Sequence, residues 1–409
     1  MSSTKPKLLL IMPSTLRGGV EEYNLTAARG ALTQGWDVHI GFPDRPGTAT
    51  LIQDFRNSGI TYHPLDIAED DNPLPSVTRH IPRLFRTLRL MIALKPDVAQ
   101  VTLPAPDYCL GSILACGLLK VPTMVRFGLV LPLETEINPL RIRAYQWVRC
   151  RCQQWVTISQ NNRRLLAEMF HIPERDIACI YNGAKPPSIH NPGPDARATL
   201  RRQIRQELNL PESTRLLLTV GRLNAQKGHR DLIPAIPAIL REFPNVRFVW
   251  VGDGDLRPEL AAQLREHQVQ DKVLLLGYRS DVPRLLQAAD VFVFPTHFEG
   301  GQSFAIAEAM TAGLPIVTSD ASGIPEVIQH RVHGLIFPRG DQDAVGETLR
   351  WALQHPETME SFAQAARERA EDFTESTMLQ NYGALWRQLS QRNPEAVPTP
   401  NIALHPDQV

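Results

Sequence analysis

Two cations and two carboxylates in the second half of the chain have the types and spacing to hold a ligand that carries phosphate and hydroxyl groups. Arg222 and Lys227 stand five positions apart in a loop after an apolar run over 216–220, so they can grip a diphosphate from two directions. Arginine offers paired donors and lysine a compact charge. Glu299 and Glu308 would repel phosphate, but a carboxylate can accept two hydrogen bonds from a sugar or ribose. Because surface cations are common, the two cations alone are weak evidence for a binding site, and the elements around them must be considered.

Those elements predict two strands that open into glycine-bearing loops at one crevice. Val291 to Pro295 is apolar throughout, as in a strand covered on both faces, and Pro315 to Ser319 is a second such strand. Between them we expect a helix from Phe304 to Ala312, with Ser303 as its cap and Gly313 as its end. The unpaired amides and the dipole at such a helix start favour negative charge, which suits a phosphorylated ligand.

The stretch from Glu299 to Glu326 resembles the retaining glycosyltransferases of family 4, which have the GT-B fold. That family carries two glutamates separated by seven residues, then E-A-M, a small residue, G-x-P and G-G-x-x-E. The matching residues here are Glu299, Glu308-Ala309-Met310, Gly313, Pro315 and Ser322-Gly323-Ile324-Pro325-Glu326. In this chain eight residues lie between the two glutamates, which leaves the register of Glu299 open.

The resemblance extends to two further loops and one strand end. Gly221 to Gly228 resembles the family's G-R-L-x-x-x-K-G, and Gly18-Gly19 matches its glycine-rich loop, although a plain turn would also explain a glycine pair. Many family members have a histidine where this chain has Phe127, so no catalytic histidine can be assigned. Arg126, just before it, is expected either at the acceptor or in a structural role, and Arg17 is placed on the acceptor side.

From the resemblance we expect an α/β GT-B protein: two Rossmann-like, doubly wound parallel-sheet domains facing a central cleft, with a C-terminal helix that crosses back to the N-terminal domain. The predicted parts are an acceptor-binding domain over 1–190 with the returning helix 374–390, a linker and surface helix over 191–213, a nucleotide-sugar-binding domain over 214–373, and a disordered tail over 391–409. Alternating apolar runs and helical stretches agree with two parallel sheets.

The resemblance also implies the site. The expected catalytic residues are Arg222, Lys227 and Glu299. The expected donor-binding residues are Gly18, Gly19, Arg222, Lys227, Arg279, Glu299, Gly300, Gly301, Gln302, Ser303, Phe304 and Glu308. No D-x-D-like run follows a strand, so no metal and no other cofactor is expected, and the cations would neutralise the leaving diphosphate.

Composition agrees with a large enzyme. The 409 residues exceed what one core usually supports, which favours two domains. The formal net charge is zero, with 43 Lys and Arg against 43 Asp and Glu, which argues against nucleic acid as a partner. The five cysteines have no CxxC spacing and predict reduced thiols. No run approaches the ~20 apolar residues that cross a bilayer, so we expect a cytoplasmic protein.

Two basic stretches in the N-terminal half, Leu74 to Lys95 and Leu140 to Cys152, mix arginines with apolar residues. In the first, Leu84, Leu88 and Ile92 share one helical face and arginines occupy another. The ordinary interpretation is a helix packed on the sheet with a solvated basic side. The alternative is contact with an anionic membrane at its inner face, with a lipid-linked acceptor.

The function implied is metal-independent, retaining transfer of a hexosyl unit from a UDP- or GDP-sugar donor to a hydroxyl of a glycan or lipid-linked acceptor, in polysaccharide, lipopolysaccharide or glycolipid synthesis. The alternative is a noncatalytic nucleotide-sugar-binding protein with a degenerate site, which Phe127 and the longer glutamate spacing favour. A sugar-nucleotide epimerase that shares the fold is a third candidate, and the signature from Glu299 to Glu326 argues against it.

Overall fold

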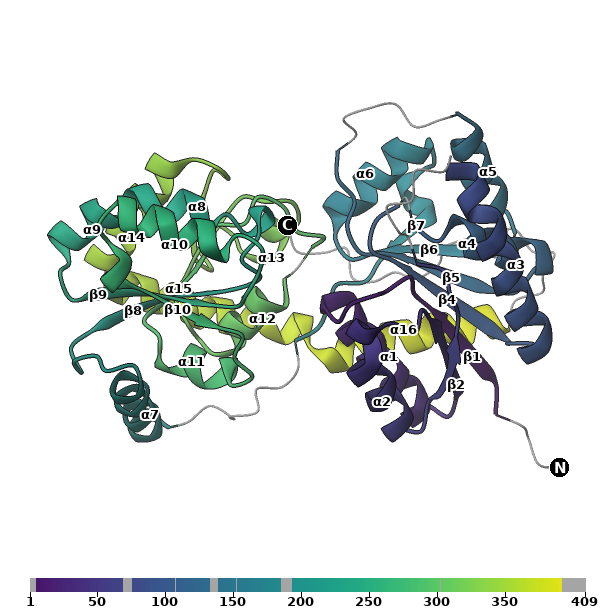
Figure 1. Ribbon diagram of the computed structural model, residues 1–409, viewed down its shortest axis with the longest axis horizontal. Helices are drawn as coiled ribbons and strands as arrows, with labels where there is room; N and C mark the ends of the chain where they lie inside the picture. The colour runs from purple at the N-terminus through teal and green to yellow at the C-terminus, as the bar shows by residue number, and fades with distance from the viewer. Residues whose placement is uncertain are drawn as a thin grey trace. The chain divides into compact units, whose positions relative to one another are not determined.

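A computed structural model of the protein describes residues 5–68, 76–106, 108–132, 139–151, 153–184, 193–301 and 303–391 (Figure 1). The chain divides into two compact units, the first formed by Met1–Tyr181 with Ser376–Val409 and the second by Asn182–Glu375. The predicted site residue Gln302 and the predicted tail from position 392 onward lie outside the described residues. Each unit is built around one parallel sheet.

The sheet of unit 1 has the strand order β3-β2-β1-β4-β5-β6-β7, with every neighbouring pair parallel. Its strands are β1 (Lys7–Ile11), β2 (Asp37–Phe42), β3 (Thr61–Pro64), β4 (Val98–Leu103), β5 (Thr123–Phe127), β6 (Gln153–Thr157) and β7 (Ile177–Cys179). The helices between them are α1 (Gly19–Thr33), α2 (Ala49–Asn57), α3 (Ser76–Leu94), α4 (Leu110–Leu119), α5 (Pro139–Arg149) and α6 (Gln160–Phe170). This is the doubly wound pattern expected from the alternation of apolar runs and helical stretches.

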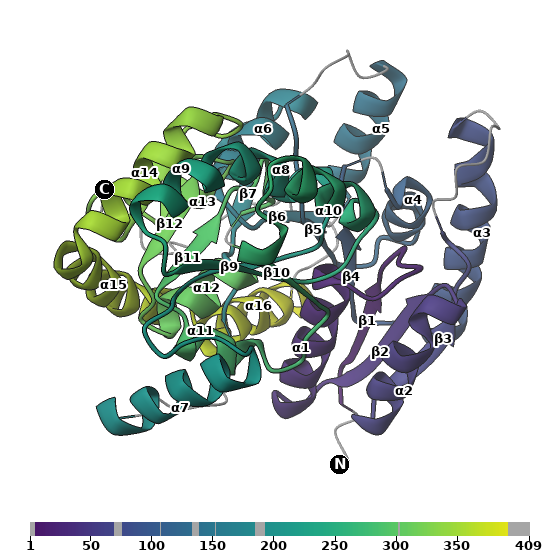
Figure 2. The same ribbon diagram turned by 60° about the vertical axis from the view of Figure 1, so that its left-hand side comes forward.

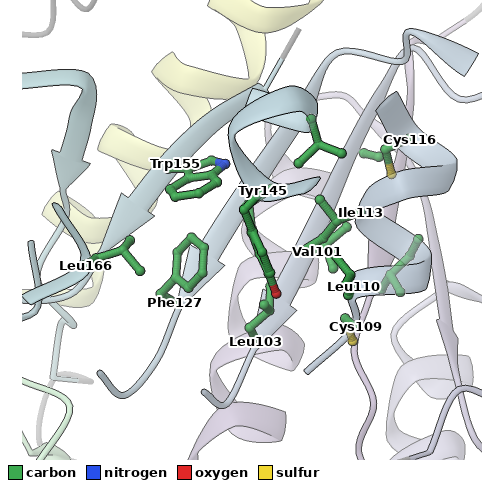
Figure 3. Packing of buried hydrophobic residues seen from close by; sticks show 14 of the residues in the cluster. Val101, Leu103, Cys109, Leu110, Ile113, Cys116, Phe127, Tyr145, Trp155 and Leu166 are labelled. Carbon is green, nitrogen blue, oxygen red and sulfur yellow. The ribbon is translucent and has the colours of Figure 1, made fainter. Parts of the chain in front are cut away.

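One face of this sheet is covered by α3 to α6, and an aromatic cluster lies beneath them (Figure 3). Phe127 of β5 lies 5.1 Å from the Trp155 ring of β6, and Tyr145 of α5 lies 5.8 Å from the same ring. Val101 and Leu103 of β4 extend the cluster toward α4. Because all of these side chains are buried, their removal from water is the main force that holds the helices on the sheet.

The opposite face carries α1 and the last helix of the described ranges, α16 (Glu375–Ser390). Tyr23 and Tyr382 meet edge to face at 5.3 Å, and the indole of Trp386 donates a hydrogen bond of 3.1 Å to Gln100 Oε1 on β4. The C-terminal helix therefore completes the core of the N-terminal unit, as predicted.

The sheet of unit 2 has the order β10-β9-β8-β11-β12-β13, again parallel at every pairing. Its strands are β8 (Arg215–Val220), β9 (Val246–Val251), β10 (Val273–Gly277), β11 (Val291–Phe294), β12 (Ile316–Ser319) and β13 (Leu335–Phe337). Its helices are α7 (Pro194–Glu207), α8 (His229–Leu232), α9 (Ile236–Glu242), α10 (Arg257–Glu266), α11 (Val282–Ala288), α12 (Phe304–Thr311), α13 (Ile324–Val327), α14 (Gln342–Gln354) and α15 (Pro356–Ala370). A core centred on Trp250, Phe248 and Val293 joins the sheet to α8, α9 and α14.

One predicted strand is displaced along the chain. The sequence predicts Trp155 to Ser159, whereas β6 begins at Gln153. The two glutamines at its start are buried because their side-chain amides donate to carbonyls, Gln153 to Ile113 O at 3.1 Å and Gln154 to Asp176 O at 3.3 Å. Ser159 instead caps α6 by accepting a hydrogen bond from the Asn162 backbone N–H.

None of the helices in the described ranges is both long enough and apolar enough to span a bilayer.

Candidate active site

The loops that carry Lys227 and Glu299 leave neighbouring strands at the centre of the unit 2 sheet. β8 and β11 pair directly, with Leu217 opposite Val291 and Leu218 opposite Phe292. From β8 the chain winds outward through β9 to β10, and from β11 it winds the other way through β12 to β13. The junction of β8 and β11 is therefore the topological switch point, where doubly wound sheets bind ligands at the carboxyl ends of the strands.

Lys227 and Glu299 meet at this junction. The Lys227 ammonium forms a salt bridge with Glu299 Oε1 and lies 4.9 Å from the centre of the Phe294 ring. Thr296 Oγ1 donates a second hydrogen bond to the same carboxylate oxygen at 2.9 Å. The side chains of the pair are only 15% and 10% exposed, so the lysine charge is largely shielded from solvent and fixed in position. A fixed ammonium at this place can stabilise negative charge that develops on a bound ligand.

Backbone contacts hold the two loops together. The carbonyl of Gln226 accepts a hydrogen bond from the His297 N–H at 2.7 Å and lies 3.0 Å from Thr296 Oγ1, and the Gln226 side-chain amide donates to Phe298 O at 2.9 Å. Gly228 has a φ of +64°, and a Cβ there would lie 1.9 Å from Pro295 O. Only glycine allows both this conformation and this approach, so Gly228 sets the spacing of the loops.

Two histidines flank the same loops. His297 Nε2 lies 2.8 Å from Asp231 Oδ2, which ties the loop after β11 to α8. His229 is buried against Trp250, and neither of its ring nitrogens has a hydrogen-bond partner among the residues that the structure describes. Burial, with a smaller contribution from the nearby Lys227 charge, lowers the pKa of His229 to about 4. The imidazole is therefore neutral at physiological pH, and Lys227 supplies the positive charge.

Arg222 lies exposed on the same loop as Lys227, and within the described ranges its side chain makes no ion pair. The loop rests on the segment after β9, where the Leu223 N–H donates to Asp253 O at 3.0 Å. Close approach of the two segments depends on Gly252, because a Cβ there would lie 2.0 Å from Gly221 O. The guanidinium is thus presented to solvent by a loop of fixed shape.

The helix α12 begins at Phe304, shortly after Glu299 in the sequence. Ser303 is its N-cap residue, but its side chain makes no capping hydrogen bond, which corrects the predicted role. Its carbonyl accepts the Ala307 N–H at 3.0 Å instead. Gly301 is buried and Phe304 is the first helical residue, while Glu308 lies half-buried on the second turn. The Glu299 N–H donates to Ser322 Oγ at 3.2 Å, which joins this loop to the turn after β12. Gly300 is the next residue of the same loop.

Arg279 occupies a separate network in unit 2. Its guanidinium makes two hydrogen bonds of 2.7 Å to the Asp281 carboxylate and one of 2.7 Å to Glu207 Oε1. These bonds, opposed by burial, raise the pKa of Arg279 and lower that of Asp281 to about 2. The structure therefore gives this side chain carboxylate partners on α7 and in its own loop, and does not bring it to the Lys227–Glu299 pair.

The remaining predicted residues belong to unit 1. Gly18 is the N-cap of α1 and Gly19 its first residue, at the end of the loop after β1. A Cβ at Gly19 would meet nothing within 4 Å, so packing does not require glycine there. Arg17, next to them, forms salt bridges of 2.6 Å with Glu22 and 2.7 Å with Asp54.

Arg126 is buried, with 2% of its surface exposed. Its guanidinium stacks 3.6 Å from the centre of the Tyr23 ring, and its Nε donates to the Tyr382 hydroxyl at 3.1 Å. This geometry joins α1 and α16 to β5 and supports the structural alternative over the acceptor contact. Phe127, at the position of the family histidine, is fully buried in the aromatic cluster.

Sequence reasoning missed Thr296, Asp231 and His297, which hold the loops around the Lys227–Glu299 pair. A histidine and a threonine directly after an apolar strand were an available signal, because residues at the carboxyl end of a central strand face the ligand site. In the described segments, no group of three or more His, Cys, Asp or Glu side chains is arranged to hold a metal ion.

Two protein-family profiles match this chain, one in each half. The profile of Glycosyltransferase Family 4 matches residues 17–186, and that of Glycosyl transferases group 1 matches residues 201–369. An uncharacterized glycosyltransferase of Methanocaldococcus jannaschii is 34% identical over 205 residues, which are 49% of this chain and 50% of that protein. A UDP-Gal:alpha-D-GlcNAc-diphosphoundecaprenol alpha-1,3-galactosyltransferase of Escherichia coli is 28% identical over 66% of this chain and 71% of its own length.

Solved structures are similar over nearly the whole chain. A glycosyltransferase from Rickettsia africae superposes with a TM-score of 0.79 at 17% identity, covering 95% of this chain and 100% of that one. HepE of Anabaena, crystallised with UDP-glucose, gives a TM-score of 0.72 at 18% identity, with 94% and 100% coverage. The sequence matches are shorter, and the chain spans about half the length of the first curated relatives it matches. With both family profiles matched in order and the fold shared, the chain belongs to the family 4, group 1 glycosyltransferases and has their GT-B fold.

Proposed function

We propose that the protein transfers a hexosyl unit from a nucleotide-diphosphate sugar to a hydroxyl group of an acceptor, with retention of anomeric configuration. The observation that carries this proposal is the Lys227–Glu299 pair at the switch point of the unit 2 sheet. It supplies a shielded positive charge where a diphosphate would meet the strand ends and the start of α12.

In the proposed reaction the bond between the sugar C1 and the diphosphate oxygen breaks, and a bond forms between C1 and the acceptor oxygen on the same face. The proton of the acceptor hydroxyl passes to the departing diphosphate. Lys227, Arg222 and the amides near Gly301 and Phe304 stabilise the charge on that leaving group, in the place where other enzymes use a metal ion. Glu299 holds Lys227 in position, and Glu308 accepts hydrogen bonds from the ribose.

The donor proposed is a UDP-sugar, and a GDP-sugar is the alternative. HepE is crystallised with UDP-glucose, and the Escherichia coli relative is named for UDP-Gal. That relative is also named for a diphosphoundecaprenol acceptor, which favours a lipid-linked or glycan acceptor in envelope polysaccharide, lipopolysaccharide or glycolipid synthesis. The compartment proposed for the reaction is the cytoplasm.

The test is nucleotide release from a panel of UDP- and GDP-hexoses, with water as the slow acceptor and with lipid or glycan acceptors added. We expect release of UDP from one donor, loss of release in Lys227→Met, and unchanged release after treatment with a chelator. Dependence on added divalent metal would contradict the roles given to the two cations.

The second candidate is a noncatalytic nucleotide-sugar-binding protein, and the burial of Phe127 at the histidine position favours it. Isothermal titration separates the two functions. Donor binding without any nucleotide release, with or without acceptor, would establish the binder and refute the transferase.

A further inference from the structure

Two pairs of acidic and basic side chains join the same two segments of unit 2. The segment from the loop after β8 to α8 supplies the cation Lys227 and the acid Asp231. The loop after β11 supplies the acid Glu299 and the base His297. Lys227 pairs with Glu299, and His297 pairs with Asp231, so each segment holds the other through one acidic and one basic group. The proposed reaction uses the first pair at the ligand, and the second pair lies beside it.

Asp231 is a buried acid, with 7% of its surface exposed. Its neighbour Arg230 pairs with Glu259 on α10, so in the part of the chain that the structure describes His297 is the only basic side chain in an ion pair with Asp231. The distance from His297 Nε2 to Asp231 Oδ2 is 2.8 Å, and a proton must lie between the two groups because bare lone pairs would repel each other there. A buried carboxylate is costly unless it is paired, so this contact binds His297 to α8.

His297 also contacts two other loops. Its backbone N–H donates to Gln226 O at 2.7 Å, in the loop after β8. Its ring Cε1 lies 3.5 Å from the place that a Cβ would take on Gly340, in the turn after β13, where a φ of +77° favours glycine. The imidazole therefore lies where the loops after β8, β11 and β13 meet.

The loop after β11 has to cross the end of the sheet. α8 and α12 lie on opposite sides of the unit 2 sheet, and this loop runs from β11 to α12 (Figure 2). The contact between His297 and Asp231 holds the beginning of the loop to the α8 side. Thr296 directly precedes His297 and Glu299 follows two positions later, and both bear on Lys227 because Thr296 Oγ1 lies 2.9 Å from the carboxylate oxygen that pairs with Lys227.

We propose that Asp231 is a positioning residue: through His297 it holds the loop after β11 so that Lys227 stays at the junction of β8 and β11. The inference rests on the proposed function, in which Lys227 stabilises charge on the leaving diphosphate. Asp231 acts without touching the ligand. When a diphosphate competes with Glu299 for Lys227, the second pair keeps the two segments together because it does not use the lysine.

The first test is kinetic. Asp231→Leu and His297→Leu should each reduce kcat for nucleotide release by about tenfold to a hundredfold, the loss that follows a displacement of about 1 Å. The donor KM should change by less than about twofold, because the lost stabilisation belongs to the transition state. His297→Gln keeps an N–H donor at the place of Nε2 and should retain most of the activity. Equal losses in His297→Gln and His297→Leu would contradict the proposal.

The matched control is Glu259→Leu, which breaks the ion pair from Arg230 of the same helix to α10 and should leave kcat unchanged. A double variant tests whether Asp231 acts through the lysine. In Lys227→Met, the further change Asp231→Leu should cause no additional loss of nucleotide release, because the group to be positioned is absent. An additional loss of the full size would show that Asp231 acts elsewhere, and it overturns the proposal.

The second test needs no activity. Amine-reactive labelling of the folded protein, read by mass spectrometry, reports how well Lys227 is shielded, with Lys272 of unit 2 as internal reference. The Lys227 side chain is 15% exposed, so the wild type should react slowly. Asp231→Leu and His297→Leu should react several-fold faster at Lys227, and Glu259→Leu should not. Unchanged labelling in the two folded variants overturns the proposal.

A thermal melt confirms that each variant is folded. Should Asp231→Leu fail to fold, His297→Leu takes its place, since that side chain is 38% exposed.

Failure of the proposed function gives a different result. Absence of nucleotide release by the wild type would refute the transferase, and the labelling rates would still decide whether Asp231 positions Lys227. Release by the wild type with full kcat in Asp231→Leu would refute the positioning role alone.

Discussion

Lys227 and Glu299 form a salt bridge across two loops of unit 2 although 72 positions separate them in the chain. The paired β8 and β11 bring the loops together, and the shared Gln226 carbonyl and the glycine at 228 set their spacing. The charge proposed to act on a diphosphate is thus positioned by the sheet itself, before any ligand is present.

The losses of unfolding free energy in the two single variants should add up to more than the loss in the double variant. Lys227→Met or Glu299→Gln leaves the other group buried without its partner, and each should destabilise unit 2 by about 3 kcal/mol. The double variant should fall short of the sum by at least about 1 kcal/mol in urea unfolding. Strict additivity would show that the two side chains do not interact in solution.

In nucleotide release, Lys227→Met should reduce kcat by about a hundredfold or more.

Gly228→Ala should separate the two loops. The φ of +64° and the distance of 1.9 Å to Pro295 O both oppose a side chain, so we expect a loss of more than about 2 kcal/mol in unfolding free energy. Gly313→Ala is the matched control, because Gly313 has a φ of +63° but only an ordinary contact at 3.5 Å. Similar losses for the two variants would show that backbone conformation, and not the close approach, explains the effect.

Gly19→Ala distinguishes a plain turn from a ligand-facing loop. With nothing within 4 Å of the added Cβ, stability should remain the same or rise by up to about 1 kcal/mol, since alanine favours the helix. If the loop meets the ligand through its backbone, nucleotide release should fall about tenfold or more. Gly193→Ala, at an equally open position before α7, should leave release unchanged. Full activity of Gly19→Ala would assign Gly18-Gly19 to the turn alone.

His229 should make unit 2 sensitive to acid. Its folded-state pKa of about 4 lies below the ordinary value of 6.5, so the unfolded chain binds the proton more readily. The stabilisation is complete above pH 6.5 and is lost as the pH falls toward 4, by roughly 3 kcal/mol in total. His229→Phe keeps the ring beside Trp250 and should flatten the dependence of unfolding free energy on pH across this window. The exposed His267→Asn serves as control, and a slope unchanged in His229→Phe would contradict the assignment.

The strands with continuous apolar character were predictable from the sequence. β11 and β12 lie within the predicted ranges 291–295 and 315–319, because β-branched and aromatic residues occupy almost every position of these buried strands. The predicted start of β6 was two residues late because Gln153 and Gln154 have polar side chains, which do not indicate a buried strand. Only the folded chain supplies the carbonyl groups to which their amides donate.

The sequence indicated Lys227 and Glu299 as candidate site residues but neither their contact nor the residues that hold the loops around them. Lys227 and Glu299 were identified from their loops, whereas their salt bridge depends on the adjacency of β8 and β11, which local spacing does not encode. Arg126 illustrates the reverse case. A cation at a strand end left a ligand contact and a structural role equally open, and its contacts with aromatic residues of α1 and α16 favour the structural role.

The position of α16 in the core of unit 1 affects the order in which the two units can fold during translation. Tyr382 and Trp386 are among the last described residues, yet they pack against Tyr23, Trp36 and Gln100 near the beginning of the chain. During translation, unit 2 can finish folding before α16 leaves the ribosome, but the nascent unit 1 keeps an uncovered aromatic face until α16 has been synthesised.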